Sequence, residues 1–210
     1  MATALESRML PDCFRSTDTR LMFMMAAALG LKDRYTEAHA RRVADYAGRL
    51  ADRIGMLPEE IQQIKLGGML HDLGKLALSD RIFSNQKAAL STELLSEVRS
   101  HPLIGAALLK HINCMEFVCD VVLYHHERID GTGYPFGLEG DAIPLGAKIV
   151  SVADCFDAIT TDRPYQRGKS CEQALKMLDD IAGTSLSAEL VPIFIDEIRH
   201  NGMELPPVTV

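Results

Sequence analysis

The chain has 210 residues, of which 47% are hydrophobic and 24% are charged, so it can form one large domain with a substantial apolar core. Its net charge is −7 and no basic stripe runs along it, which excludes a protein that binds DNA through many phosphate contacts. Five cysteines match neither a zinc-site spacing nor a disulfide framework, so we expect reduced thiols and a cytoplasmic protein.

Residues 1–31 are predicted to be an N-terminal segment, part of which is a linker. Within it, Asp18 is suited to cap a first helix that runs through Leu29 and ends at Gly30. The longest apolar run, residues 21–31, is shorter than the ~20 residues that cross a bilayer, and no convincing signal-peptide cleavage site follows it. We therefore expect no membrane association.

Two helices are predicted next, and each carries a histidine on its inner side. Residues 36–54 have an apolar stripe at helical spacing, and His39 lies on that stripe. A lone inward histidine is more often a core residue than a ligand, so His39 by itself decides nothing. The following helix begins at Pro58 and carries His71 on one face with Ile61 and Ile64, and its pair Gly67-Gly68 predicts close contact with a neighbouring helix.

The middle of the chain is expected to contain a loop with short helical pieces, residues 76–90, and then three helices. These helices are predicted over residues 91–100, 103–111 and 117–126. His101 precedes a proline, so it should be a cap or corner residue at a helix junction. His125 and His126 end a buried stripe, and two buried imidazoles without partners are costly, which favours ligands over packing.

The last third of the chain begins with a structured loop over residues 127–146, which is rich in glycine and is predicted to be functional. The apolar helix predicted over residues 145–161 is interrupted by Asp154 and Asp157, each of which must be paired or bind a metal. Two amphipathic scaffold helices are expected after it, over residues 171–182 and 187–200.

Seven of these side chains have the ligand chemistry of a metal centre. An adjacent histidine and aspartate offer a nitrogen and an oxygen, and a carboxylate can bridge two ions. One ion does not need seven ligands, so the set favours two octahedral ions, Fe or Mn first, with Ni, Co or Zn as alternatives. Spacing alone does not show that the residues converge. The seven are His39, His71, Asp72, His101, His125, His126 and Asp154.

A pair of ions ~3.5–4 Å apart is a common device for phosphoester hydrolysis, because it acidifies a water and polarises a phosphoryl oxygen. Lys75 lies four residues after His71, so it shares a helix face with that histidine if the helix persists. Together with Arg163, Lys75 would hold the anionic substrate.

The order of these residues resembles the HD-GYP domain family, from about Lys32 to Phe194. The resemblance implies an all-α, HD-superfamily bundle of about seven helices with a long GYP loop, spanning residues 32–200 and followed by an extended tail, residues 201–210. It rests on His39, His71-Asp72-x-Gly-Lys75, His101-Pro102, the string from His125 through Gly133-Tyr134-Pro135, Asp154 and Asp162-Arg163-Pro164-Tyr165.

The resemblance also implies a bacterial signalling enzyme that hydrolyses cyclic di-GMP to pGpG, or on to GMP, with a di- or trinuclear metal centre. The seven residues named above correspond to its metal ligands, and Asp72 and Lys75 are the implied catalytic residues. Lys75 would contact the scissile phosphate. The other implied substrate contacts are Arg128, Tyr134, Arg163 and Arg167.

Three departures from the family pattern refine this expectation. Trinuclear members carry a glutamate four residues before the first histidine, where this chain has Tyr35, so we predict a dinuclear centre and pGpG as the main product. Gln166 replaces a common Lys or Arg, and Arg167 is the candidate substitute. The usual Lys-Pro-Gly after the His-Asp helix reads Asn85-Gln86-Lys87, which predicts a lid of different shape.

Two rival functions remain open at this point. Some family members act on cyclic GMP-AMP, and the motifs contain nothing that separates the two bases. A cyclic di-GMP receptor or interaction module with little turnover is the alternative from another class, because such domains also dock diguanylate cyclases (GGDEF proteins). A homodimer is compatible with either.

Overall fold

The computed structural model describes residues 34–203 apart from 85–90, 111, 113–114 and 163–166. Over these residues the chain forms nine α-helices and two short 3₁₀ helices, with isolated bridges but no strand. The predicted all-α class is therefore confirmed. The helix expected over residues 18–29 and the lid segment at residues 85–87 lie outside the described residues.

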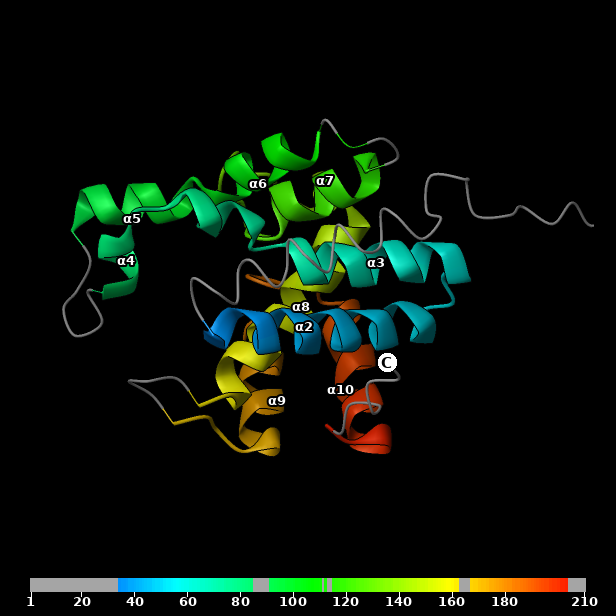
Figure 1. Ribbon diagram of the computed structural model, residues 1–210. Coiled ribbons are helices and arrows are strands. Elements are labelled where there is room, and N and C mark those ends of the chain that lie inside the picture. Colours follow the sequence, from blue (N-terminus) through cyan, green and yellow to red (C-terminus); the bar gives the residue numbers. More distant parts are fainter. Residues whose placement is uncertain (1–33, 85–90, 111, 113–114, 163–166, 204–210) are drawn as a thin grey trace, which may run out of the picture.

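Two long helices, α2 (Arg34–Arg53) and α3 (Pro58–Leu70), lie side by side across the middle of the molecule (Figure 1). The predicted stripe on α2 is buried, with Val43, Ala47 and Leu50 fully inaccessible. Gly68 of α3 explains the close packing, since a Cβ there would come within 2.9 Å of the Ala44 backbone. This contact holds the end of α3 against the middle of α2.

The larger hydrophobic core lies on one side of α2, where α8 (Leu145–Thr160), α9 (Cys171–Asp180) and α10 (Leu190–Asn201) pack (Figure 1). The rings of Tyr46, Phe156 and Phe194 meet edge to face at its centre, with centroids 5.2–6.2 Å apart. The last helix begins at Leu190 rather than Ser187, because the Ser187 hydroxyl accepts from the Leu190 backbone N–H and holds the chain just before it.

The smaller core lies on the other side of α3, at the top of Figure 1, between α6 (His101–Leu109) and α7 (Glu116–Tyr124). The short helices η2 (Leu73–Ala77), α4 (Asp80–Ser84) and α5 (Thr92–Arg99) connect α3 to α6. A Cβ on Gly74 would lie 1.9 Å from the His101 carbonyl oxygen, so only glycine allows η2 to pack against α6. This contact places the residues after α3 beside the start of α6.

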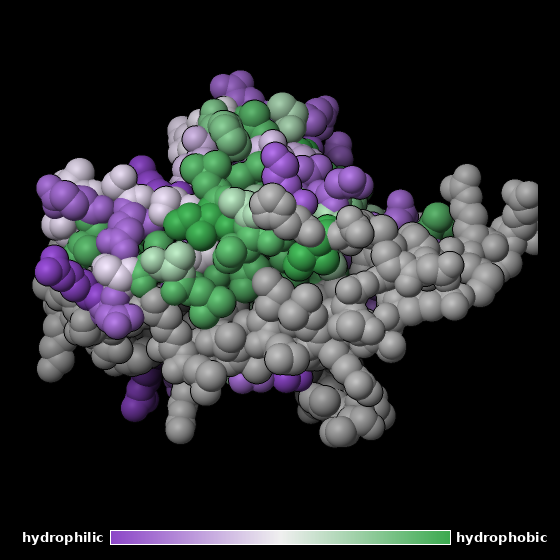
Figure 2. Space-filling view, turned by 45° about the horizontal axis from the view of Figure 1, so that its top comes forward, coloured by the Kyte–Doolittle hydropathy of each residue, from purple (hydrophilic) through white to green (hydrophobic). Residues whose placement is uncertain are grey.

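When the top of Figure 1 is turned forward, hydrophobic side chains gather at the centre of the visible face, with hydrophilic residues around them (Figure 2). The large apolar side chains exposed on the described part of α5 and α6 are Leu95, Leu103 and Leu108. Among the described residues, no helix combines the length and apolar character that a membrane span requires.

Candidate metal centre

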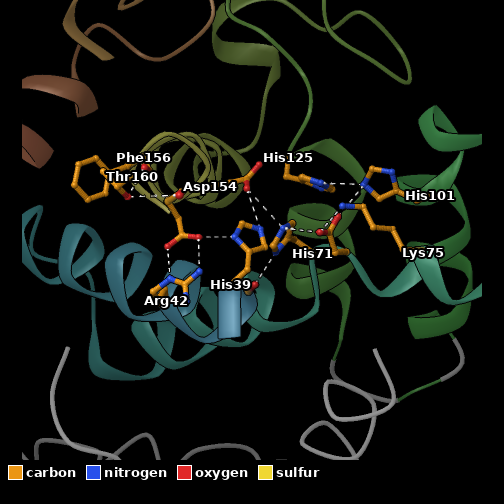
Figure 3. A network of polar contacts seen from close by, with 12 residues as sticks. His39, Arg42, His71, Lys75, His101, His125, Asp154, Phe156 and Thr160 are labelled. Atoms are coloured by element: carbon orange, nitrogen blue, oxygen red, sulfur yellow. Dashed lines mark hydrogen bonds and ion pairs between the residues drawn. The ribbon is translucent and has the colours of Figure 1, made fainter. Parts of the chain in front are cut away.

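All seven predicted ligands come together between the two cores, most of them at the ends of helices. Figure 3 labels five of them, His39, His71, His101, His125 and Asp154. His71 and Asp72 follow the last residue of α3, and His125 and His126 follow the last residue of α7. His101 is the first residue of α6, where a start at residue 103 was expected. The remaining two are His39 on α2 and Asp154 on α8.

Backbone carbonyls orient three of the imidazoles. The Nδ1 atoms of His71, His101 and His125 lie 2.7, 2.7 and 2.8 Å from the carbonyl oxygens three residues earlier. A carbonyl can only accept, so each Nδ1 carries a proton, and in the neutral form of each ring Nε2 keeps its lone pair. Helix ends leave such carbonyls unpaired, and for this reason a histidine placed there is held with Nε2 directed inward.

Burial keeps several of the imidazoles uncharged. It lowers the pKa of His101 and of His126 to about 4, and that of His125 well below its ordinary value. At neutral pH these three rings therefore present neutral nitrogen donors. Metal ions bind the neutral form of histidine, so the protonation state of these three rings fits a metal centre.

The ligand atoms form two groups that share one carboxylate. One group is His39, His71 and Asp154, and the other is His101, His125 and His126, with ligand atoms within 4.8 Å of one another in each. A third set with equally close ligand atoms, His71, Asp72 and His125, joins the two groups. The Oδ2 atom of Asp72 lies 3.4 Å from His71 Nε2, and its Oδ1 atom lies 3.4 Å from His101 Nε2. Asp72 is 2% exposed, and its two oxygens face the two groups and, at Oδ2, the Nζ atom of Lys75. This arrangement fits a carboxylate that bridges two ions.

The carboxylates also attract the positive charges of the cluster. Burial alone would lower the pKa of His39, but its hydrogen bonds with Asp154 and Asp157 raise it to about 9. Despite burial, the positive charge of Lys75 and the neighbouring histidines hold the pKa of Asp72 well below its ordinary value. The Lys75 Nζ lies 2.6 Å from Asp72 Oδ2. The carboxylates of Asp72, Asp154 and Asp157 therefore make the cluster a favourable place for positive charge.

Asp157 supports the cluster from behind without facing it. Its Oδ2 accepts a hydrogen bond from His39 Nδ1 at 2.7 Å, and its two oxygens accept from Arg42 Nε and Nη2 at 2.5 and 3.1 Å (Figure 3 shows Arg42 and His39). The predicted need of Asp157 for a partner is confirmed. His39 Nε2 is thereby directed at Asp154 Oδ1, 3.2 Å away.

Lys75 reaches the cluster by a different route from the one predicted. Helix α3 ends at Leu70, so Lys75 does not share its face with His71 but lies on the 3₁₀ helix η2. Its side chain is 31% exposed and that of Asp154 is 21% exposed. By contrast, His39, His71, His101 and His125 are buried. A substrate would therefore approach the cluster from the side of Lys75 and Asp154.

The loop between α7 and α8 packs against the cluster through its tyrosine. The Tyr134 ring stacks on the His126 ring, with centroids 4.7 Å apart and planes 28° from parallel. Glu127, which is 4% exposed, accepts the backbone N–H groups of Phe136 at 2.7 Å and Leu138 at 2.9 Å. A Cβ on Gly133 would collide with the backbone of Glu127 and the next residue, so glycine is required there.

The residues predicted to contact the substrate lie in different places. Tyr134 lies at the cluster, whereas Arg128 makes an ion pair with Asp130 at 3.1 Å on the exposed side of the loop. Arg167 is exposed, and Arg163 lies outside the described residues. Sequence reasoning missed Glu127 as an anchor and Arg99, whose guanidinium carbon lies 5.5 Å from the centroid of Tyr134. No spacing rule reveals either one, because both contacts depend on the loop conformation.

A family model described as the HD domain matches residues 24–190 of the chain. The string from His125 to Pro135 occupies the loop beside the clustered histidines. The chain is an HD-GYP domain. The family resemblance seen in the sequence is thus confirmed, while the role of each clustered residue as a metal ligand stays a prediction.

Relatives of this HD-GYP domain are longer proteins. It is 36% identical over 166 residues to the cyclic di-GMP phosphodiesterase of Thermotoga maritima, covering 78% of this chain and 45% of the relative. It is 33% identical over 184 residues to the 3′3′-cGAMP-specific phosphodiesterase 2 of Vibrio cholerae, covering 87% of this chain and 35% of the relative. The chain thus spans less than half the length of these relatives.

A solved structure has the same fold. The crystal structure of a cyclic GMP-AMP-specific phosphodiesterase of Vibrio cholerae superposes with a TM-score of 0.70, covering 88% of this chain and 49% of that one. The sequences are 17% identical, so this similarity supports the arrangement of the helices alone.

Proposed function

We propose that this HD-GYP domain is a metal-dependent phosphodiesterase that hydrolyses cyclic di-GMP to linear pGpG in bacterial second-messenger signalling. The observation that carries the proposal is the arrangement of seven nitrogen and oxygen ligands in two groups that share Asp72. The names of the curated relatives given above support the substrate class.

The proposed metal centre is dinuclear, with Fe or Mn as the ions that suit a set of imidazoles and carboxylates without thiolate. When bound, two such ions acidify a water and stabilise the charge that develops on a phosphoryl oxygen. Tyr35 stands on α2 one turn before His39, at the position where a glutamate would supply a further ligand. We infer two ions per chain for this reason, and pGpG rather than GMP as the main product.

The residues of the chain divide the remaining work. Asp72 holds the two groups of ligands in register, and Asp157 fixes the orientation of His39. Lys75, at the accessible edge of the cluster, provides the positive charge that receives a non-bridging oxygen of the scissile phosphate. Tyr134 covers one face of the His126 ring and would contact the ligand.

Two further expectations belong to the same proposal. The free thiols of Cys119, Cys155 and Cys171 support a cytoplasmic protein. Docking of a GGDEF diguanylate cyclase and formation of a homodimer stay predictions.

Metal counting combined with a comparison of two substrates tests the proposal. Protein purified without oxygen should contain two ions per chain, and three would contradict the inference from Tyr35. The same preparation is then incubated in parallel with cyclic di-GMP and 3′3′-cyclic GMP-AMP. Faster hydrolysis of cyclic di-GMP supports the proposal, and faster hydrolysis of the mixed dinucleotide favours the second candidate. Tight binding without turnover of either would identify a receptor instead.

A further inference from the structure

A positively charged side chain that the family motifs do not include lies at the edge of the metal centre. Arg99 is the last residue of α5, two positions before His101. Its guanidinium carbon lies 5.5 Å from the centroid of the Tyr134 ring, and that ring stacks on His126 at 4.7 Å. A row of three side chains therefore leads outward from the ligand cluster, and Arg99 is its outer end.

The backbone at Arg99 is held by the cluster itself. The carbonyl of Val98 accepts from Nδ1 of His101 at 2.7 Å, so the orientation of a proposed metal ligand depends on the residue just before Arg99. The side chain of Arg99 is exposed. Its position at the edge of the cluster is therefore set by the same contacts that set His101, while the guanidinium remains accessible to a ligand.

Among the residues that the structure describes, the other cations near the cluster already have carboxylate partners. Lys75 is 2.6 Å from Asp72, Arg42 binds Asp157, and Arg128 is paired with Asp130. Within the described part of the chain, Arg99 makes no ion pair with a carboxylate. Its guanidinium therefore has its hydrogen-bond donors available, and a guanidinium is suited to bind a phosphate through two parallel hydrogen bonds.

We propose that Arg99 binds the second phosphodiester of the cyclic dinucleotide, the one that is not cleaved. This inference rests on the proposed function. A cyclic dinucleotide carries two phosphodiesters in one ring, so a second anion necessarily accompanies the one at the metal centre. Lys75 binds the phosphate at the cluster. Arg99 lies beyond the Tyr134 side chain, where the second phosphate of the cyclic dinucleotide would be placed.

The linear dinucleotide GpG provides a direct test, because it has both guanines and one phosphodiester but lacks the second phosphate. In the wild-type protein, the KM for cyclic di-GMP should be lower than the KM or Ki for GpG by about 10-fold or more. Arg99→Ala should remove most of this preference by raising KM for cyclic di-GMP, with kcat, metal content and affinity for GpG unchanged. The expected difference of about 10-fold corresponds to the loss of one hydrogen bond to a charged group.

Two variants serve as controls. Arg99→Lys keeps the charge without the planar pair of donors and should fall between wild type and Arg99→Ala. Arg199→Ala removes an exposed arginine of α10 that is paired with Glu172, and it should leave both affinities unchanged.

Two results would overturn the proposal. One is an unchanged preference in Arg99→Ala, and the other is an equal loss of affinity for GpG, which would indicate contact with a base or disorder of the loop. Calorimetric titration of cyclic di-GMP separates this failure from failure of the proposed function. Binding weakened by Arg99→Ala in a protein without turnover would uphold the role of Arg99 and reject the enzyme. Equal binding by both proteins would reject the role of Arg99.

Discussion

Replacing Asp157 by asparagine should weaken one of the two metal ions selectively. Both oxygens of Asp157 accept hydrogen bonds, from Nδ1 of His39 at 2.7 Å and from Nε of Arg42 at 2.5 Å. Asparagine has one acceptor oxygen, so its NH₂ group must face one of these two donors. Loss of such a supporting hydrogen bond typically costs about 10- to 100-fold in metal affinity.

The same substitution should lower the stability of the metal-free protein. It removes one hydrogen-bond acceptor from a side chain that is only 1% exposed, and the loss of a buried hydrogen-bond partner costs about 1–3 kcal/mol. Arg42 is 24% exposed and partly solvated, so we expect the lower end of that range, about 1 kcal/mol. Asp180→Asn is the matched control, since the pair of Asp180 with Lys176 is exposed on α9 and should contribute less than about 0.5 kcal/mol.

The assay is a titration of metal-free protein with Mn(II) against a competing chelator, together with urea unfolding. Asp157→Asn should show one ion bound with wild-type affinity, at His101, His125 and His126, and one bound more weakly. Wild-type affinity for both ions would refute the reasoning that Asp157 orients His39. Equal weakening of both ions would show that the two groups of ligands do not act separately.

Three other substitutions separate the roles within the site. Asp72→Ala should abolish turnover and reduce the metal content, because it removes the shared carboxylate, and retained activity would exclude Asp72 from the mechanism. Lys75→Ala should slow turnover by roughly 10²-fold or more while both ions stay bound, and loss of metal would show that its role is structural. Glu127→Gln should raise KM for cyclic di-GMP several-fold at constant metal content, because one of the Phe136 and Leu138 backbone N–H groups loses its charged acceptor. Wild-type KM in that variant would mean that the loop keeps its shape without the carboxylate.

Apolar spacing in the sequence predicted most helices, whereas the convergence of the ligands was expected from the family resemblance, because spacing alone does not show that distant residues meet. Apolar spacing located α2 and α8, and an aspartate in the apolar α8 indicated that Asp154 and Asp157 need partners. The end of α3 before Lys75 could not be predicted, since it depends on contact between Gly74 and His101. Arg99 was missed for a similar reason, because its contact with Tyr134 joins two segments that have no common periodicity.

The central claim is that the ligands clustered around Asp72 hold the metal ions that hydrolyse a cyclic dinucleotide. The most direct test compares metal-free and metal-replete protein, purified without oxygen, in a discontinuous assay with cyclic di-GMP and either Mn(II) or Fe(II). The account predicts that pGpG accumulates only with the metal-replete protein. Absence of hydrolysis by a protein shown to contain both ions would contradict it.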